Sequence, residues 1–94
     1  MKYYVYILLT VDDTFYTGIA TDVLRRFEEH KISVKGAKYL KCHPPKEIVF
    51  VKKFPDKSSA LKEEYRIKNL VKKEKLALIE KHSAKTKEFL NQQK

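Results

Sequence analysis

The sequence predicts one small α+β domain, because three of its segments have the pattern of β-strands and three have the pattern of helices. The chain has 94 residues, of which 43% are apolar and 12% aromatic, enough for a compact core. A chain of this length leaves much of its surface exposed, so we expect a shallow site and not a cleft between two lobes. The run 3–9 is apolar on both faces, which predicts a central strand.

A hairpin is predicted where this strand is followed by turn residues and a second apolar run at 15–19. We expect a three-residue loop at 11–13, which puts Tyr6 and Tyr16 on the same face of the sheet. A two-residue turn would put them on opposite faces. Both tyrosines also fit as ordinary core or sheet-surface residues. Gly18 in the second strand predicts a close approach to the backbone.

The first helix is predicted to begin after a cap at Thr21 or Asp22 and to end near Lys31. Residues 32–46 have the composition of an exposed basic loop, and a third strand is expected at 47–54.

Two further helices are expected in the second half of the chain. The first follows a cap at Asp56 or Ser58, and the second covers 74–81. We expect the domain to comprise residues 1–82. The remaining residues, 83–94, are polar apart from Phe89 and Leu90 and form either a docked last turn or a frayed tail, of which we expect the frayed tail.

The net charge of +9 lies mostly in the second half, where residues 51–94 carry 13 basic and 6 acidic side chains. This excess predicts a polyanionic partner, and the alternative is a lysine-rich surface that serves only solubility. The apolar start is too short for a membrane span or a signal peptide. With Cys42 as the single cysteine, no internal disulfide can form, and we expect a cytoplasmic protein without a membrane partner.

Glu64 is the most informative position, because helical spacing places it in the apolar stripe of its helix, beside Ala60 and Ile67. A carboxylate buried there needs a cation, an ion-pair partner or water. A metal site and a structural ion pair with Arg or Lys are both open. Glu63 lies nearer the edge of the stripe and is the weaker candidate.

Asp22, Arg26 and His30 are spaced four residues apart and share one face of the first helix. Arginine can grip a phosphate with two hydrogen bonds, and histidine can relay a proton, so the pair suits phosphate chemistry. The alternative is an ordinary solvated helix face.

Taken together, these residues resemble the GIY-YIG nuclease family over roughly residues 2–80. The resemblance is closest to small stand-alone bacterial members related to the amino-terminal nuclease domain of UvrC. The motifs that carry it are, in order, Tyr4-Val5-Tyr6-Ile7-Leu8, Tyr16-Thr17-Gly18, Arg26 with His30, Lys35-Gly36-Ala37-Lys38-Tyr39, and Glu64 followed by Ile67-Lys68.

The resemblance implies a three-stranded antiparallel sheet flanked by helices, and cleavage of a DNA phosphodiester with one divalent ion, Mg²⁺ or Mn²⁺. By position, the site would comprise the motif tyrosines Tyr6 and Tyr16, the motif glycine Gly18, the helix arginine Arg26, His30 where the family has His or Tyr, and the metal ligand Glu64. We expect Tyr16 to be the base and Tyr6 its orienting partner. Departures from the family pattern are Val5, Ile19 in place of a lysine of the excision-repair members, and Cys42-His43-Pro44 in place of an arginine-rich loop ending.

A nucleic-acid contact strip is expected in the basic loop, formed by Lys35, Lys38, Tyr39, Lys41 and Lys46. The alternative is a solvated lysine-rich loop. The expected function is therefore a metal-dependent endonuclease of DNA repair or processing, with specificity supplied by a protein partner. Two other classes remain open: a nucleic-acid-binding module with weak or no cleavage, and a structural subunit in which Glu64 is only ion-paired.

Overall fold

The computed structural model describes residues 2–31, 40 and 42–92 and confirms the α+β class. Its sheet is antiparallel, with the strand order β2-β1-β3, so the first strand is central as predicted. The elements in chain order are β1 (Tyr3–Thr10), β2 (Phe15–Ala20), α1 (Val23–Lys31), β3 (Pro45–Phe54), α3 (Lys57–Lys68), α4 (Lys72–Lys81) and α5 (Ser83–Gln92). The third strand and the third helix each begin two residues before the predicted start.

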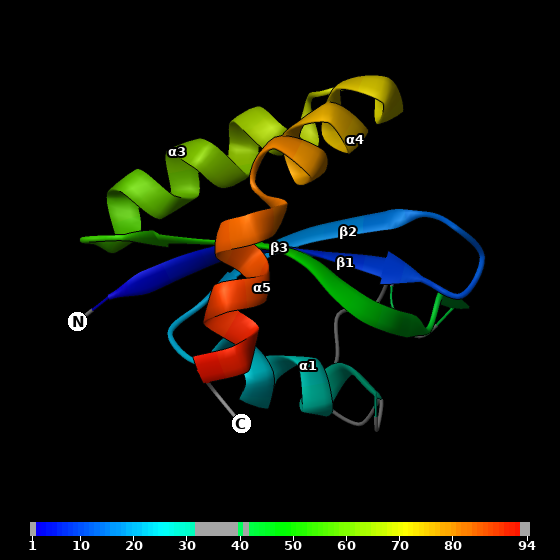
Figure 1. Cartoon of the computed structure of the whole chain (residues 1–94), viewed down its shortest axis with the longest axis horizontal. Helices are drawn as coiled ribbons and strands as arrows, with labels where there is room; N and C mark the ends of the chain where they lie inside the picture. Colours follow the sequence, from blue (N-terminus) through cyan, green and yellow to red (C-terminus); the bar gives the residue numbers. More distant parts are fainter. Residues whose placement is uncertain (1, 32–39, 41, 93–94) are drawn as a thin grey trace.

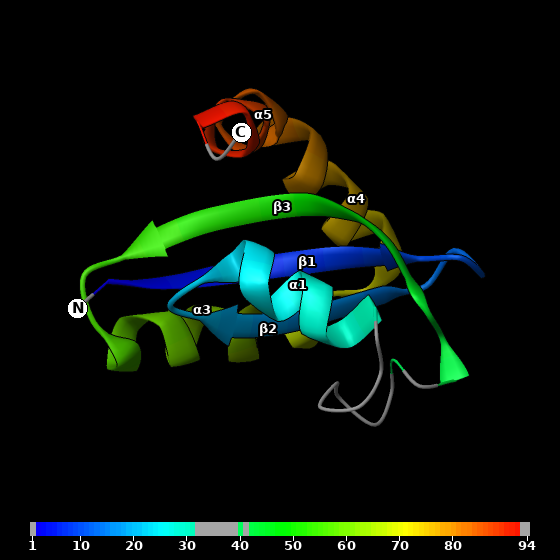
Figure 2. The same cartoon turned by 90° about the horizontal axis from the view of Figure 1, so that it is seen from below.

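The sheet separates two apolar clusters, because successive side chains of a strand point to opposite faces. Val5 and Ile7 pack with residues of α3 on one face, and Tyr6 and Leu8 pack with Val23 of α1 on the other. Figure 1 shows α3 and α4 on one side of the sheet and α1 on the opposite side. In Figure 2, seen from below, α1 lies in front of the strands. The central strand is therefore covered on both faces.

The β1–β2 hairpin has the expected odd loop. Thr10 N–H donates to the carbonyl of Thr14 at 2.9 Å, which encloses three loop residues. The last of these, Asp13, has a φ of 62°, in the left-handed region that aspartate tolerates better than most residues. This loop fixes which side chains of the two strands share a face.

Aspartates begin two of the helices, as their spacing predicts. Asp22 Oδ1 accepts the N–H of Arg25 at 3.1 Å, and Asp56 Oδ1 accepts that of Ser59 at 2.8 Å. These bonds satisfy amides that have no partner within the helix. Among the residues described, no helix combines the length and the apolar character needed to cross a bilayer.

The expectation of a frayed tail is wrong for residues 83–92, which form the helix α5. Thr86 is buried, and the Phe89 ring packs against that of Tyr4 with centroids 5.2 Å apart. In Figure 1, α5 runs from the α4 side of the sheet past β3 toward α1. The few apolar residues of this segment are sufficient because polar side chains also hold the helix to β3.

Candidate active site

The hairpin places Tyr6 and Tyr16 on the same face of the sheet. Tyr6 lies opposite Gly18, and Tyr16 lies opposite Leu8. The two tyrosines are thus diagonal neighbours, and their ring centroids are 6.3 Å apart. The pairing expected from the odd loop is confirmed.

Gly18 provides the space in which the two rings meet. A Cβ atom at this position would lie 2.7 Å from Tyr6 Oη and 3.1 Å from Tyr16 Cε2. The first distance is too short for a carbon–oxygen contact, so any side chain would displace the Tyr6 ring. Here the close approach predicted for Gly18 involves a side chain, the phenol of Tyr6.

Helix α1 adds Arg26 and His30 to the tyrosine pair. His30 Nε2 lies 3.2 Å from Tyr6 Oη, and the His30 ring meets that of Tyr16 edge to face at 5.6 Å. The positive charge of Arg26 acts on the Tyr6 hydroxyl and lowers the pKa of that phenol. Asp22, the third residue of the predicted face, caps the helix and is not placed in this cluster.

Burial raises the pKa of Tyr6 well above its ordinary value of about 10, and negative charge on Tyr16 and Glu64 raises this pKa further. Arg26 acts in the opposite direction, but the phenol remains neutral. Burial and the charge of Arg26 lower the pKa of His30, so its ring is neutral at pH 7. The neutral phenol and the neutral imidazole therefore share one hydrogen bond between Tyr6 Oη and His30 Nε2.

Arg26 and Arg25 share one carboxylate but differ in exposure. Arg26 Nη1 donates to Glu29 Oε1 at 3.1 Å, and Arg25 Nε lies 3.5 Å from Glu29 Oε2. The side chain of Arg26 is 37% exposed and that of Arg25 is 77% exposed. Both arginines line a hollow of about 280 Å³ between α1 and the end of β2. Arg26 therefore joins a solvent-accessible hollow to the buried tyrosine.

Glu64 lies on α3, the helix that packs on the opposite face of the sheet from α1. Its side chain is only 17% exposed, and its neighbours in the helical stripe, Ala60 and Ile67, are fully buried. The carboxylate is close enough to Tyr6 to raise the pKa of that phenol. It also pairs with Lys68, with Nζ and Oε2 3.4 Å apart, and Lys68 is half exposed. The ion pair expected as an alternative is present, but it opens to solvent on the lysine side.

Glu63, the weaker candidate, has a different environment. Both of its oxygens accept from Arg66, at 2.7 and 2.8 Å. These hydrogen bonds lower the pKa of the Glu63 carboxyl. Because both oxygens are already bound, Glu63 is a suitable control for Glu64.

The arrangement of tyrosines, arginine and glutamate agrees with the comparison to known families. The family model described as "GIY-YIG catalytic domain" matches residues 2–77. The chain belongs to the GIY-YIG family. The family domain supports an endonuclease-like function, and helix α5 follows the matched residues.

GIY-YIG relatives of similar length cover most of the chain. UPF0213 protein OB0043 of Oceanobacillus iheyensis is 48% identical over 79 residues, which are 84% of this chain and 91% of that protein. UPF0213 protein YhbQ of Salmonella typhimurium is 42% identical over 82 residues, 87% of this chain and 81% of that protein. The solution NMR structure of UPF0213 protein BH0048 from Bacillus halodurans is 41% identical, with a TM-score of 0.58, and the match covers 88% of this chain and 87% of that one.

The GIY-YIG family implies a divalent ion, and the donor set at Glu64 fits one. The described residues contain no group of three or more His, Cys, Asp or Glu side chains that could together hold a metal. Mg²⁺ needs no such group, since it keeps several waters and binds one or two carboxylates. Glu64 supplies one carboxylate, largely buried and with a single ion-pair partner among the described residues.

Most of the predicted contact strip lies outside the described residues, namely Lys35, Lys38, Tyr39 and Lys41. Lys46, at the start of β3, is exposed. His43, in the loop ending that departs from the family pattern, pairs with Asp12 of the hairpin loop. That pair ties the end of the basic segment to the β1–β2 loop.

Two residues near the site were not predicted from the sequence. Glu29 holds Arg26, and its spacing of three residues from Arg26 on the helix was an available signal. Thr17 stands between the motif residues Tyr16 and Gly18 in the sequence, and its side chain is buried. Its hydroxyl has no hydrogen-bond partner in the described part of the chain. No sequence signal distinguishes such a hydroxyl from an ordinary strand threonine.

Proposed function

We propose that this protein is a metal-dependent nuclease that hydrolyses a phosphodiester of DNA in repair or processing. The observation that carries the proposal is the convergence of Tyr6, Tyr16, Arg26 and His30, which come from two strands and a helix. Glu64 lies on a second helix, and its charge acts on Tyr6. A +9 chain suits a polyanionic substrate.

Arg26 is the group we assign to the phosphate. A guanidinium donates two parallel hydrogen bonds to phosphate oxygens and stabilises the negative charge that builds on them in the transition state. Its hydrogen bond to Glu29 holds its position before the substrate binds. Its partial exposure leaves it accessible from the hollow beside α1.

Tyr16 is the group we assign to the attacking water. In its phenolate form it accepts a proton as the water oxygen bonds to phosphorus and the bond to the leaving sugar oxygen breaks. Tyr6 is unsuited to this role, because its raised pKa keeps it protonated. It positions Tyr16 and Arg26 instead, and His30 holds the Tyr6 hydroxyl.

Glu64 is the residue that would hold the divalent ion, together with water. The ion, Mg²⁺ or Mn²⁺, supplies positive charge that stabilises the leaving oxygen. Lys68 is half exposed, so its ammonium group can move into solvent when an ion takes its place at Glu64.

The pairing of Glu64 with Lys68 also favours a second candidate function. If that pair is permanent, no carboxylate is available for a metal, and the fold would serve to bind nucleic acid with weak or no cleavage.

The two functions separate in one experiment. Wild-type protein and the Glu64→Ala variant are incubated with branched and single-stranded DNA and RNA, with and without Mn²⁺. The nuclease proposal predicts Mn²⁺-dependent cleavage by the wild type and none by the variant. Binding by both proteins without cleavage by either would favour the second function.

A further inference from the structure

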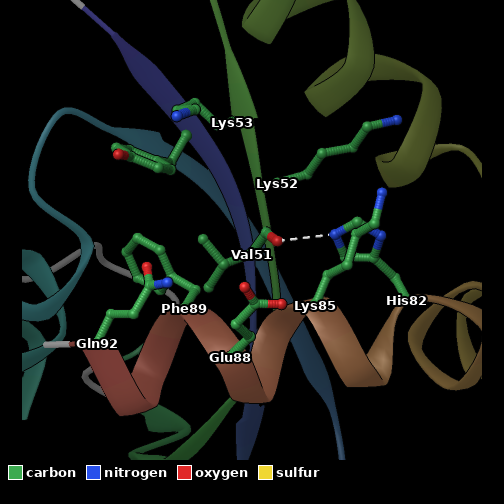
Figure 3. A pocket seen from close by; sticks show the side chains of 9 residues that line it. Val51, Lys52, Lys53, His82, Lys85, Glu88, Phe89 and Gln92 are labelled. Atoms are coloured by element: carbon green, nitrogen blue, oxygen red, sulfur yellow. Dashed lines mark hydrogen bonds between the residues drawn. The ribbon is translucent and has the colours of Figure 1, made fainter.

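A groove of about 520 Å³ lies between α5 and the outer edge of β3, beyond the residues assigned to cleavage. Figure 3 shows its lining side chains, with Lys52 and Lys53 contributed by β3 and Lys85 by α5. Tyr4 and Phe89 form an aromatic wall. The family match ends at residue 77, so it does not include the α5 side of this groove.

Two side chains bind the edge of β3 beside the groove: Thr86 of α5 and His82, which ends α4. Val51 N–H donates to Thr86 Oγ1 at 3.2 Å. His82 Nε2 donates a hydrogen bond to the carbonyl oxygen of Val51 at 3.0 Å. The second of these bonds is drawn in Figure 3. The edge amide and carbonyl of Val51 are thereby satisfied, so a second strand is not needed there.

The charge of the groove favours an anion. Three lysines line it against one acidic residue, Glu88. In Figure 3, Lys52 and Lys85 extend past His82 on one side, and Lys53 lies at the other end. Neither Lys53 nor Lys85 forms an ion pair with any residue in the described ranges.

One row of paired residues across the three strands leads from the groove to the candidate active site. Tyr4 pairs with Lys53 of β3 on one side and with Ala20 of β2 on the other. Ala20 lines the hollow that contains Arg26. Two strand spacings separate Ala20 from Lys53, about 10 Å, or roughly three steps of a stacked nucleic-acid strand.

We propose that the α5–β3 groove binds the backbone of a single nucleic-acid strand a few nucleotides from the phosphate held by Arg26. Lys53 and Lys85 contact phosphates, and Tyr4 offers an aromatic surface at the entrance. The volume suits one or two nucleotides. The proposal rests on the proposed nuclease function, because that function places a phosphate at Arg26. The groove itself can be tested by binding alone.

The test compares two double variants that lose the same charge. Lys53→Gln/Lys85→Gln removes groove lysines, and Lys73→Gln/Lys87→Gln removes lysines of α4 and α5 that do not line the groove. Binding of a fluorescent single-stranded oligonucleotide is measured in EDTA over a series of salt concentrations. We expect the groove variant to bind about tenfold more weakly and its salt slope to fall by about 1.4, the value for two lost phosphate contacts on a single strand.

Equal effects of the two double variants, or no effect of the groove variant, would overturn the proposal. So would equally tight binding of polyglutamate of the same charge, which would point to an acidic protein as the occupant. Hydrolysis of bis(p-nitrophenyl) phosphate, which is too short to reach the groove, is measured in parallel with Mn²⁺. It should be unchanged in the groove variant. If the wild-type protein does not hydrolyse this compound, the nuclease function is refuted, whereas the binding result still tests the groove.

Discussion

Tyr6 is a buried residue whose surroundings leave little freedom, since Gly18 and His30 both lie against its hydroxyl. The shared face of the tyrosines and the role of Gly18 followed from loop parity and strand pattern, both of which are local properties. The bond between Tyr6 and His30 could not be predicted, because it joins residues that are 24 positions apart.

Substituting Gly18→Ala should therefore impair the site more than the fold. The new Cβ would lie 2.7 Å from Tyr6 Oη, and the Tyr6 ring is buried. We expect a loss of unfolding free energy of about 1–3 kcal/mol, typical of overpacking, and a loss of cleavage of at least about tenfold. Urea denaturation and cleavage rates measure the two effects.

The double variant Gly18→Ala/Tyr6→Phe is the control for that clash. Removing the hydroxyl oxygen should restore part of the lost stability without restoring cleavage. A Gly18→Ala protein with wild-type stability and rate would show that the close approach has no importance.

Glu64 and Lys68 test whether the carboxylate is a ligand or only half of an ion pair. If Glu64 holds a metal, Glu64→Gln should abolish Mn²⁺-dependent cleavage, while Lys68→Met and the control Glu63→Gln should keep it within about threefold, since neither Lys68 nor Glu63 is assigned to the metal. Cleavage assays over a Mn²⁺ titration measure this. An equal loss in Lys68→Met and Glu64→Gln would assign the pair a structural role.

At the scale of elements, α5 shows where sequence patterns stop being informative. Its polar composition suggested fraying. The hydrogen bonds that hold it are made to the edge of β3, and local sequence does not reveal that partner. The strands and the first helices were predictable since apolar periodicity and caps are encoded locally.

Thr86→Val tests the attachment of α5. The substitution keeps the shape of the side chain but removes the acceptor of Val51 N–H, leaving that amide unsatisfied. We expect a cost of about 1–3 kcal/mol in unfolding free energy, against a smaller cost for Thr86→Ser, which keeps the hydroxyl. Equal stabilities of the Val and Ser variants in urea denaturation would mean that this bond does not hold the helix.

Two histidines, His30 in α1 and His82 at the end of α4, also make stability depend on pH. Burial lowers the pKa of both His30 and His82 relative to the unfolded chain. Because the unfolded state then binds protons more readily, stability is highest above about pH 6.5 and falls as the pH decreases below that value. Urea denaturation at pH 7.5 and pH 5 should show this fall, and a smaller one in His82→Gln. If the unfolding free energy of His82→Gln falls between pH 7.5 and pH 5 as much as that of the wild type, His82 is excluded as a source of the pH dependence.

At the scale of the whole molecule, the sheet connects the cleavage site to the groove. The hollow beside Arg26 lies at the β2 edge, the groove lies at the β3 edge, and the row Ala20, Tyr4 and Lys53 joins them. The excess of positive charge in the second half of the chain includes the groove lysines. Charge distribution along the sequence predicted a polyanionic partner. The path proposed for that partner, from Arg26 to the α5–β3 groove, depends on how the chain folds.

The most direct test of the account is the rate of cleavage at saturating protein for wild type, Arg26→Ala and Arg25→Ala. The two arginines share Glu29, but only Arg26 reaches Tyr6. We predict a loss of about 10²–10³-fold for Arg26→Ala and of less than about threefold for Arg25→Ala, with oligonucleotide binding in EDTA retained by both. Equal rates for the two variants would contradict the assignment of the site.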